Sequence, residues 1–329
     1  MEQGPWEVLE DAELRDRDVS EYGRQSLWRD TAGADAAKAR ELACRFELRA
    51  KAEDEVDARE TYLDLLGITA GERVLDVGCG SGVVTREIAR RVGPRGRAVG
   101  LDPSPALLTV ARELAQEAGL GDRIEFSESS ALQLPFPDRS FNAALCVTVL
   151  SHVPGGEAAI PELARVLRPG GRVGVFDLDT DMTAFTHSDR ALTRRIVAAS
   201  SDALAVDGWL ARRLPSLFAQ AGLEDVRVRG VFPLETDPRS FYANLAERSA
   251  DAAVKAGAIT EAERSTWLDA LHARGRGDPS SRDVCISSSG AASRLETIGH
   301  REKHRRFRAR QPLWPRCLRQ QRHVHRTPE

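Results

Sequence analysis

The sequence predicts an α/β fold with a doubly wound parallel sheet, and three observations point to it. From Gly71 onward, short β-branched segments alternate with amphipathic helical segments, as in sheets whose parallel strands are joined by crossover helices. A glycine-rich turn over 78–82 follows the first strand, and an acidic residue, Asp102, ends the second. With 329 residues, 41% of them hydrophobic, the chain is long enough to bury such a sheet.

This pattern divides the chain into three regions. Residues 1–70 contain no strand-like run, and 36–66 is rich in Ala, Glu, Arg and Leu, so we predict a helical N-terminal cap. Residues 276–329 are predicted to form a basic tail of low order. Between them, 71–275 forms the α/β domain, whose first five strands are expected at Arg73–Val77, Ala98–Leu101, Ile124–Phe126, Phe141–Val147 and Arg172–Phe176.

Spacing and capping residues mark the helices between these strands. Val84, Ile88 and Val92 recur at four-residue intervals, which predicts a helix with one apolar face. Ser104 followed by Pro105 is typical of a helix N-terminus. A third helix carries apolar residues on one stripe before the fifth strand, at Ile160, Leu163 and Leu167.

After the fifth strand the pattern becomes mainly helical. Two helical stretches at about 189–205 and 208–220 predict a helical insertion over about 178–222. Alternating residues over 226–232 predict a sixth strand. A capping box that begins at Thr260 opens a last helix.

The tail has a marked excess of positive over negative charge. From Gly299 to the end, ten Lys or Arg stand against two Glu, although the whole chain has a net charge of −3. The apolar period stops past Gly275, and 284–286 is the only strand candidate there. We interpret the tail as an out-of-frame read of a gene rich in G and C, with a disordered extension as the alternative.

Two further hypotheses for the tail receive little support. Its arginines could contact phosphates, but no catalytic motif of enzymes that modify nucleic acids follows the fourth strand, so we predict no nucleic-acid partner. Its four histidines could bind a metal, but no ligand spacing surrounds them: His300, His304, His323 and His325.

Composition also bears on the location of the protein. No run approaches the roughly 18 apolar residues of a membrane span, and the acidic N-terminus differs from a secretory signal. We therefore expect a cytoplasmic protein with no membrane partner. Five separated cysteines without a CxxC pair predict reduced thiols rather than disulfides or a zinc site: Cys44, Cys79, Cys146, Cys285 and Cys317.

The turn after the first strand has the chemistry of a nucleotide-cofactor site. Gly78, Gly80 and Gly82 permit positive φ and leave backbone N–H groups open to a ligand at a helix N-terminus. Their GxGxG spacing differs from the GxGxxG of nicotinamide enzymes, and Asp102 lies 20 residues farther on, where a carboxylate can accept both ribose hydroxyls. A purely structural alternative is a tight turn with Asp102 as a helix cap.

The segment from Gly71 to Phe176 resembles class I methyltransferases of the quinone-biosynthesis and sugar O-methyltransferase groups. Three motifs carry the resemblance: VLDVGCGSG over 74–82, LPFPDRSF over 134–141 and RVLRPGG over 165–171. The resemblance implies a seven-stranded, Rossmann-like class I methyltransferase sheet under the helical N-terminal cap. It also implies that the cofactor is S-adenosyl-L-methionine.

The resemblance assigns the cofactor-binding residues. In such enzymes the acid of the first strand, here Asp76, and the glycine turn hold the methionine end of the cofactor, and the acid at Asp102 binds the ribose. The family usually has Asp at the position of Ser130, where it holds the adenine amino group, and then a residue whose backbone reaches the ring, here Ala131. Asn142 stands where the family usually has Asp.

Two residues stand where a catalytic base would act. Methyl transfer requires alignment of acceptor, methyl and sulfur, and a hydroxyl acceptor must also lose its proton. His152 follows the fourth strand and Asp177 ends the fifth, and both strand ends face the crevice of this fold. The resembling sugar O-methyltransferases use a histidine and an acid at these positions, although Ser151 replaces the first of their two adjacent histidines. The resemblance thus implies catalytic roles for both residues.

A metal site is the alternative interpretation of the acids after the fifth strand. Asp177, Asp179 and Asp181 alternate and could share a face that binds Mg²⁺. The acid that metal-dependent catechol methyltransferases place after the fourth strand is absent, because Val147 and Thr148 stand there. We therefore predict no metal, and the carboxylates are expected to be solvated.

These inferences predict a methyltransferase that acts on a small-molecule acceptor. The preferred reaction is O- or N-methylation of a specialised metabolite, such as an intermediate of antibiotic biosynthesis. Quinone C-methylation is the alternative, and a non-catalytic protein that binds S-adenosylmethionine is the alternative of a different class. The cap and the helical insertion are expected to form the acceptor pocket.

Overall fold

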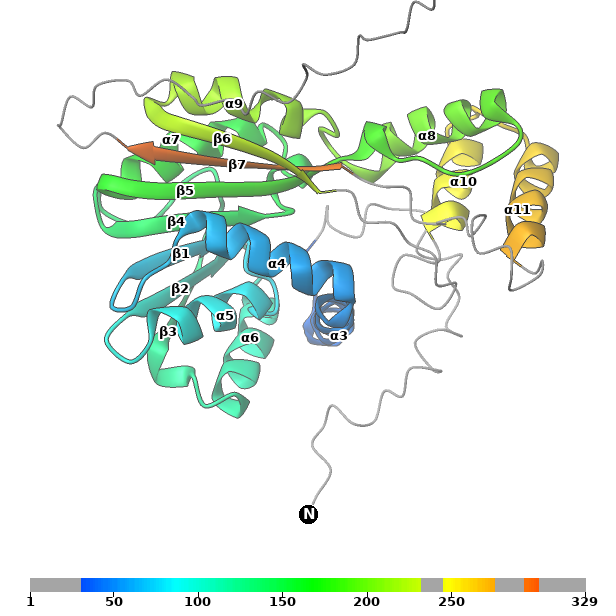
Figure 1. Cartoon of the computed structure of the whole chain (residues 1–329). Helices are drawn as coiled ribbons and strands as arrows, with labels where there is room; N and C mark the ends of the chain where they lie inside the picture. The colour runs from blue at the N-terminus through cyan, green and yellow to red at the C-terminus, as the bar shows by residue number, and fades with distance from the viewer. Residues whose placement is uncertain (1–30, 232–244, 276–292, 302–329) are drawn as a thin grey trace, which may run out of the picture.

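The computed structural model describes residues 31–231, 245–275 and 293–301, and it has a seven-stranded sheet in the order β3-β2-β1-β4-β5-β7-β6 (Figure 1). Strand β7 runs antiparallel to both neighbours, and the other strands run parallel to one another. The order reverses between β1 and β4, which is where such sheets bind ligands. The predicted fold class is confirmed. The strands are β1 Arg73–Val77, β2 Arg97–Asp102, β3 Ile124–Glu128, β4 Phe141–Val147, β5 Leu167–Asp179, β6 Leu223–Val231 and β7 Ser293–Arg301.

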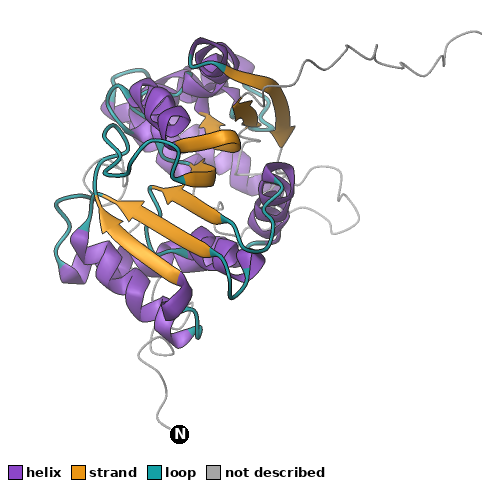
Figure 2. Ribbon diagram, turned by 90° about the vertical axis from the view of Figure 1, so that its left-hand side faces the viewer, coloured by secondary structure: helices purple, strands orange, loops and turns teal. Residues whose placement is uncertain are grey.

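Helices cover both faces of this twisted sheet (Figure 2). One face packs against α4 (Glu53–Leu66) and α5 (Val83–Val92), whose Leu63 and Ile88 are fully buried. The opposite face packs against α7 (Ala159–Val166) and α9 (Leu210–Gln220). Strands β1, β2 and β4 thus have two buried faces, which explains why they are nearly continuous runs of apolar residues.

Two helices form the described part of the N-terminal cap. Helix α3 (Ala36–Lys51) begins at Asp35, whose side chain accepts a hydrogen bond from the backbone N–H of Lys38. It packs on α6 (Pro105–Glu117), which begins at Ser104 as predicted. Helix α4 lies against the sheet itself. The cap is therefore helical, and its second helix belongs to the layered core.

The structure divides the predicted insertion of 178–222 differently. Helix α9 is a core helix, because its apolar face packs under the sheet through Leu210, Leu214 and Phe218. The accessory helical unit instead combines α8 (Arg190–Leu204) with α10 (Leu245–Lys255) and α11 (Glu261–Gly275), around the buried Trp267. Both stretches have amphipathic spacing, so the sequence alone did not show which face each would cover.

The prediction of a low-order tail from 276 onward is wrong for 293–301. Strand β7 lies there, between β5 and β6, and forms an antiparallel ladder with each of them. Two open strand edges offer backbone hydrogen bonds that a weakly patterned segment can use. The predicted strand at 284–286 lies outside the described residues.

The boundaries of the fifth strand also differ from the prediction. Strand β5 begins at Leu167 rather than Arg172, because the RVLRPGG segment continues the pairing with β4 past an irregularity at Phe141 and Ala143. The helix before it ends at Val166. Among the helices that the structure describes, none has the length and apolar character needed to cross a membrane.

Candidate active site

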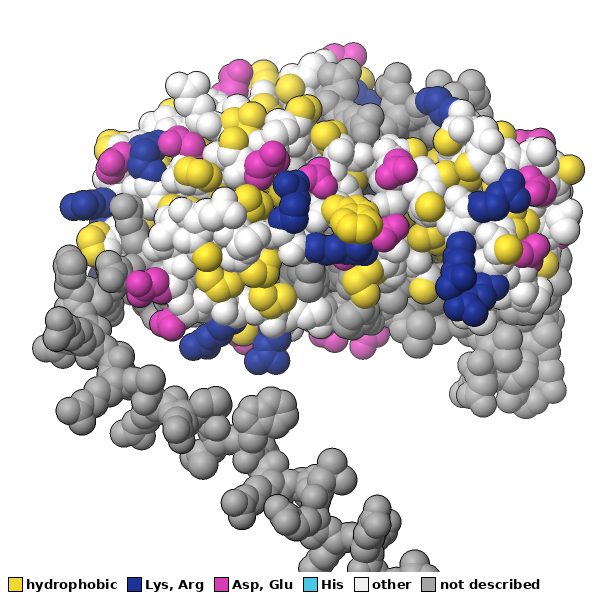
Figure 3. Space-filling model, turned by 90° about the horizontal axis from the view of Figure 1, so that it is seen from above, with side chains coloured by type: hydrophobic (Ala, Val, Ile, Leu, Met, Phe, Trp, Pro, Cys, Tyr) yellow, Lys and Arg dark blue, Asp and Glu magenta, His cyan; other side chains and the backbone are white. Residues whose placement is uncertain are grey.

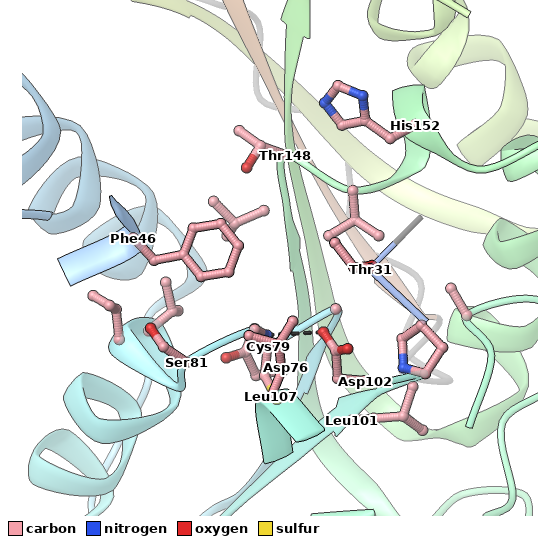
Figure 4. Close-up of a pocket in the computed structure, with 18 of the residues that line it drawn as sticks. Thr31, Phe46, Asp76, Cys79, Ser81, Leu101, Asp102, Leu107, Thr148 and His152 are labelled. Atoms are coloured by element: carbon pink, nitrogen blue, oxygen red, sulfur yellow. Dashed lines mark hydrogen bonds between the residues drawn. The ribbon is translucent and has the colours of Figure 1, made fainter. Parts of the chain in front are cut away.

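A cavity of about 300 Å³ opens beyond the carboxyl ends of β1, β2 and β4 (Figure 4). This is the place that the strand order predicts for a ligand site. The glycine turn and Asp102 line one side, and the loop after β4 lines another. Side chains of the cap helices α3 and α4 complete the wall, among them Phe46, Arg59 and Tyr62.

The glycine turn is built from backbone that only glycine tolerates easily. Gly78, Gly80 and Gly82 have φ of 74°, 53° and 79°. A Cβ on Gly78 would lie 2.3 Å from a methyl carbon of Val149, and one on Gly80 would lie 3.0 Å from the ring of Phe46. Gly78 and Gly80 line the cavity, whereas Gly82 does not and serves as the N-cap of α5.

Asp102 is held beside this turn by backbone hydrogen bonds. Its Oδ2 accepts from the N–H of Gly80 and its Oδ1 from the N–H of Ser104, both at 2.9 Å. The side chain is 5% exposed and lines the cavity. Burial raises the pKa of Asp102, and the two N–H donors partly offset that rise.

Asp76 is the second carboxylate on this side of the cavity (Figure 4). Its Oδ2 accepts a hydrogen bond of 2.6 Å from the hydroxyl of Thr85. Burial raises the pKa of Asp76 to about 7, the hydrogen bond from Thr85 opposes this rise, and the charge of Asp102 adds to it. A buried carboxylate beside a second one is suited to a cationic ligand group.

The two residues expected at the adenine follow β3 and also line the cavity. Ser130 is exposed, and its hydroxyl accepts a hydrogen bond of 3.2 Å from the N–H of Leu132. Ala131 is buried. The structure thus brings six of the seven predicted cofactor residues to one cavity, and Gly82 shapes the turn without lining it.

The two predicted catalytic residues separate in the structure. His152 ends the short 3₁₀ turn Leu150–His152 after β4, and it lines the cavity opposite Asp76 and Asp102 (Figure 4). Asp177 is fully buried, and it is not among the described residues that line the cavity. Its carboxylate accepts hydrogen bonds from Ser151 instead. The catalytic role of Asp177 stays a prediction, and its contact is with the turn that carries His152 rather than with the cavity.

Asp177 and Asp179, at the end of β5, are buried rather than solvated, contrary to the prediction, whereas Asp181 is partly exposed. Asp179 is fully buried and forms a two-point ion pair with Arg212, at 2.5 and 2.9 Å. Asp181 contacts the same guanidinium at 3.1 Å. Within the described part of the chain, no group of three or more His, Cys, Asp or Glu side chains is arranged to hold a metal ion.

Two of the motifs that carry the resemblance are bound to each other. The guanidinium of Arg165 donates to the carbonyls of Leu134 and Phe136, and Glu162 accepts from the N–H of Leu134. The hydrogen bond from Arg165 lowers the pKa of Glu162. This clamp fixes the loop that follows Ala131. Asn142, in contrast, has a structural role far from the cavity, because its Oδ1 accepts from the N–H of Arg73.

The cap contributes residues that sequence reasoning missed. Phe46 lies over Gly80, and Glu47 accepts hydrogen bonds from Ser81 Oγ and from Arg86. These partners are 34 and 39 residues apart in the chain, and no motif links them. Thr148 was missed too. It lines the cavity with a left-handed backbone, φ 53°, which is strained for a β-branched residue.

The described outer surface over α8 and α9 has no concentration of basic side chains of the kind that binds nucleic acid (Figure 3). Over α8 and α9, acidic, basic and hydrophobic side chains are interspersed (Figure 3). A nucleic-acid interface normally needs a continuous basic stripe. This face of the described residues therefore does not support such a partner.

Part of the chain, which includes the glycine turn and Asp102, matches a known protein family. Residues 74–171 match a family model described as "Methyltransferase domain". The chain is 31% identical over 222 residues to an uncharacterized 37.1 kDa protein in transposon TN4556 of Streptomyces fradiae, covering 66% of this chain and 64% of that protein. It is 41% identical over 115 residues to the ubiquinone/menaquinone biosynthesis C-methyltransferase UbiE of Hahella chejuensis, covering 35% and 46%.

A third relative is the methyltransferase GfsG of Streptomyces halstedii, 38% identical over 119 residues and covering 36% of this chain and 42% of that protein. The chain thus spans from 42% to 64% of the length of these three relatives. A chain in the solved complex between the Haloferax volcanii Trm112 methyltransferase activator and a methyltransferase superposes with a TM-score of 0.50 at 19% identity, over 85% of this chain and 100% of that one, which shows the fold alone. Together with the seven-stranded sheet and the glycine turn, these matches identify 74–171 as the cofactor-binding part of a class I, S-adenosylmethionine-dependent methyltransferase domain.

Proposed function

We propose that this protein transfers a methyl group from S-adenosylmethionine to the oxygen or nitrogen of a small specialised metabolite. The observation that carries the proposal is the composition of the cavity. The glycine turn, Asp76 and Asp102 lie on one side, and His152 lies across from them. A cofactor site and a candidate base thus share one space, as methyl transfer to a protonated acceptor requires.

The residues of the cavity fit the proposed cofactor. Gly78 and Gly80 line the cavity with backbone alone, so no side chain of these two residues keeps a ligand away from Asp102. Their N–H groups are bonded within the protein, to the carbonyl of Leu101 and to Asp102. We assign the ribose hydroxyls to Asp102, the methionine ammonium to Asp76, and the adenine to Ser130 and Ala131. When bound, the cofactor supplies a methyl group on a positively charged sulfur.

His152 is proposed as the base for a hydroxyl acceptor. Its imidazole can accept the proton that the acceptor loses, and a positioned base of this kind contributes typically ~10²–10⁴-fold to the rate. Val153 and Pro154 continue the wall next to it, so the acceptor would approach along a mainly apolar surface. An amine or an activated carbon would need the alignment but not the base.

Quinone C-methylation is the second candidate function. It is favoured by the match to UbiE, whose name states C-methylation in ubiquinone and menaquinone biosynthesis. A carbon acceptor that is already nucleophilic would make His152 dispensable. The two candidates therefore differ in the acceptor and in what they require of this residue.

Methyl-labelled S-adenosylmethionine offers a direct test. We expect the purified chain to bind the cofactor by calorimetry and to transfer label to a member of a panel of hydroxyl and amine acceptors. Transfer to quinone precursors alone would establish the second candidate. Binding without transfer to any acceptor would instead favour a non-catalytic protein, and preferential binding of NAD would contradict the methyltransferase assignment.

A further inference from the structure

The residue before His152 uses all of its polar atoms to anchor the turn. Ser151 is fully buried, its N–H donates to Asp177 Oδ2 at 3.0 Å, and its hydroxyl donates to Asp177 Oδ1 at 2.6 Å. Its carbonyl accepts from the N–H groups of Val206 and Asp207, at 2.8 and 2.9 Å. Ser151 thus ties the loop after β4 to β5 and to the segment between α8 and α9.

The carboxylate of Asp177 accepts hydrogen bonds at both of its oxygens. Its carboxylate accepts a third hydrogen bond, of 2.9 Å, from the N–H of Leu178. A buried carboxylate is stable only when donors surround it, and here all three donors point at its two oxygens. An amide at this position would direct an NH₂ group at a donor. The geometry of the 3₁₀ turn therefore depends on an acid whose two oxygens both accept hydrogen bonds.

The turn that carries His152 needs such an anchor. It starts after Thr148, whose left-handed backbone persists only if the surroundings over-determine it. The N–H of Thr148 donates to the carbonyl of Phe176, next to Asp177, at 2.6 Å. The N–H of His152 closes the turn on the carbonyl of Val149 at 2.9 Å. Bonds to β5 thus hold the turn at both ends.

The segment between α8 and α9 is fixed from its other side as well. A Cβ on Gly208 would lie 2.1 Å from Thr180 Oγ1 and 2.9 Å from Ser201 Oγ. Those two hydroxyls hydrogen-bond each other at 2.8 Å. The N–H groups of Val206 and Asp207, which donate to the carbonyl of Ser151, therefore belong to a closely packed segment.

We propose that Ser151 and Asp177 form a positioning pair that holds His152 on the cavity wall. Asp177 acts through Ser151 and the turn, and it neither touches the acceptor nor takes up its proton. The pair deepens the proposed function, because it rests on His152 being the base.

Two variants with a matched control test this pair. Asp177→Asn replaces the acceptor of three hydrogen bonds, and Ser151→Ala removes only the hydroxyl while both backbone donors to Asp177 remain. Asp181→Asn is the control, because this acid lies on the same segment, pairs with Arg212 and does not contact the turn. Melting temperatures and S-adenosylhomocysteine affinities establish that each variant is folded.

The first measurement needs no acceptor. Imidazole resonances of His152, assigned by their loss in His152→Ala, are titrated in the complex with S-adenosylhomocysteine. We expect both variants to move the titration midpoint by about half a pH unit or more, and Asp181→Asn to leave it unchanged. Unchanged resonances in a folded Ser151→Ala and a folded Asp177→Asn would overturn the positioning role.

The second measurement is a double-mutant cycle on turnover, with the acceptor that the labelled panel identifies. We expect Asp177→Asn to lower turnover about tenfold in the parent and less than about twofold in His152→Ala. Equal losses in both backgrounds would show that Asp177 acts independently of His152 and would overturn the proposal. If His152→Ala has no effect on turnover, the base assignment fails, while the titration still tests the positioning.

Discussion

Two buried aspartates at the carboxyl-terminal ends of two strands, with β1 and β4 between them in the sheet, have opposite relations to the cavity. Asp102 ends β2 and Asp177 lies near the end of β5, and both are buried carboxylates that accept hydrogen bonds from backbone N–H groups. Asp102 is bound by Gly80 and Ser104, and it lines the cavity. Asp177 is bound by Ser151 from the loop after β4, and it does not.

The difference shows that a strand end places the backbone, whereas the neighbouring loop decides what a side chain faces. Beside Asp102 the neighbour is Gly80, which binds the carboxylate through its backbone N–H and has no side chain to place between it and the cavity. Beside Asp177 the neighbour is a serine with a hydroxyl within reach. One carboxylate therefore remains beside a ligand space, and the other becomes part of the scaffold.

Removing β7 is expected to have the largest effect, because β7 pairs with β5, the strand that carries Asp177. Truncation after Gly275 leaves β5 as an edge strand and removes the only partner of β6 among the described strands. We expect it to cost most of the ~5–15 kcal/mol by which domains are stable, as measured by urea unfolding. Truncation after Arg301 is the control, because it keeps all seven strands. The apolar period alone would predict no loss, so a stable protein ending at Gly275 would contradict the assignment of β7.

Replacing His152 tests the wall of the cavity whose turn is bound to Asp177 through Ser151. We expect His152→Ala to lower turnover by ~10²-fold or more, because the acceptor then loses its base. Cofactor affinity should stay near that of the parent, and the dependence of the rate on pH in the histidine range should disappear. A loss below about tenfold with the parent pH profile would leave alignment as the main source of catalysis.

The two aspartates should differ in their effect on cofactor affinity. We expect Asp102→Asn to weaken S-adenosylmethionine binding about tenfold or more, because hydrogen bonds to a charged acceptor contribute ~1.5–3 kcal/mol. Asp177→Asn should change it less than about twofold, since Asp177 does not line the cavity. Calorimetry on both variants measures the contrast. Equal losses would mean that the two acids belong to one site.

The raised pKa of Asp76 predicts that stability and cofactor affinity depend on pH. Its folded pKa of about 7 exceeds the ~3.9 of an unfolded chain, so its contribution to stability is full below about pH 4 and is lost as the pH rises towards 7. A bound ammonium favours the ionised acid. We therefore expect cofactor affinity to rise as the pH increases through about 7, with release of a proton.

Calorimetry in buffers of different ionisation enthalpy measures that proton. Asp76→Asn should abolish both the release and the rise in affinity, because an amide does not titrate. Asp102→Asn is the comparison, since it leaves Asp76 in place. Proton uptake on binding by the parent would contradict the assignment of Asp76 to the ammonium.

The smallest effect is expected at the cap, which contacts the turn beside Asp102. Glu47 binds Ser81 Oγ and Arg86 from α3, so this contact should slow cofactor release. We expect Glu47→Gln to raise the dissociation rate about two- to fivefold, the scale of a partly exposed ion pair. Stopped-flow fluorescence measures the rate. Glu41→Gln, on the same helix and paired with Lys38, is the matched control and should leave it unchanged.

The sequence determined the parts of the protein that depend on neighbours along the chain. Strands β1 and β4 have the predicted bounds, and Ser104 caps its helix as expected. The glycine turn and Asp102 meet because a strand, a turn, a helix and a second strand follow one another in one βαβ unit, whose two strands pair with each other. Such short-range patterns need only the period of each element and the preferences of single residues to form.

Only the tertiary structure decided which element covers which face. Asp177 binds Ser151, which is 26 residues away in the chain. Helix α3 contacts the glycine turn through Glu47 and Ser81, which are 34 residues apart. Helix α9 packs in the core of the sheet, whereas α8 packs with α10 and α11. Strand β7 used open edges on both sides despite its weak pattern. In each case the local preference was satisfied by more than one placement, and the burial of apolar faces and the pairing of buried polar groups selected among them.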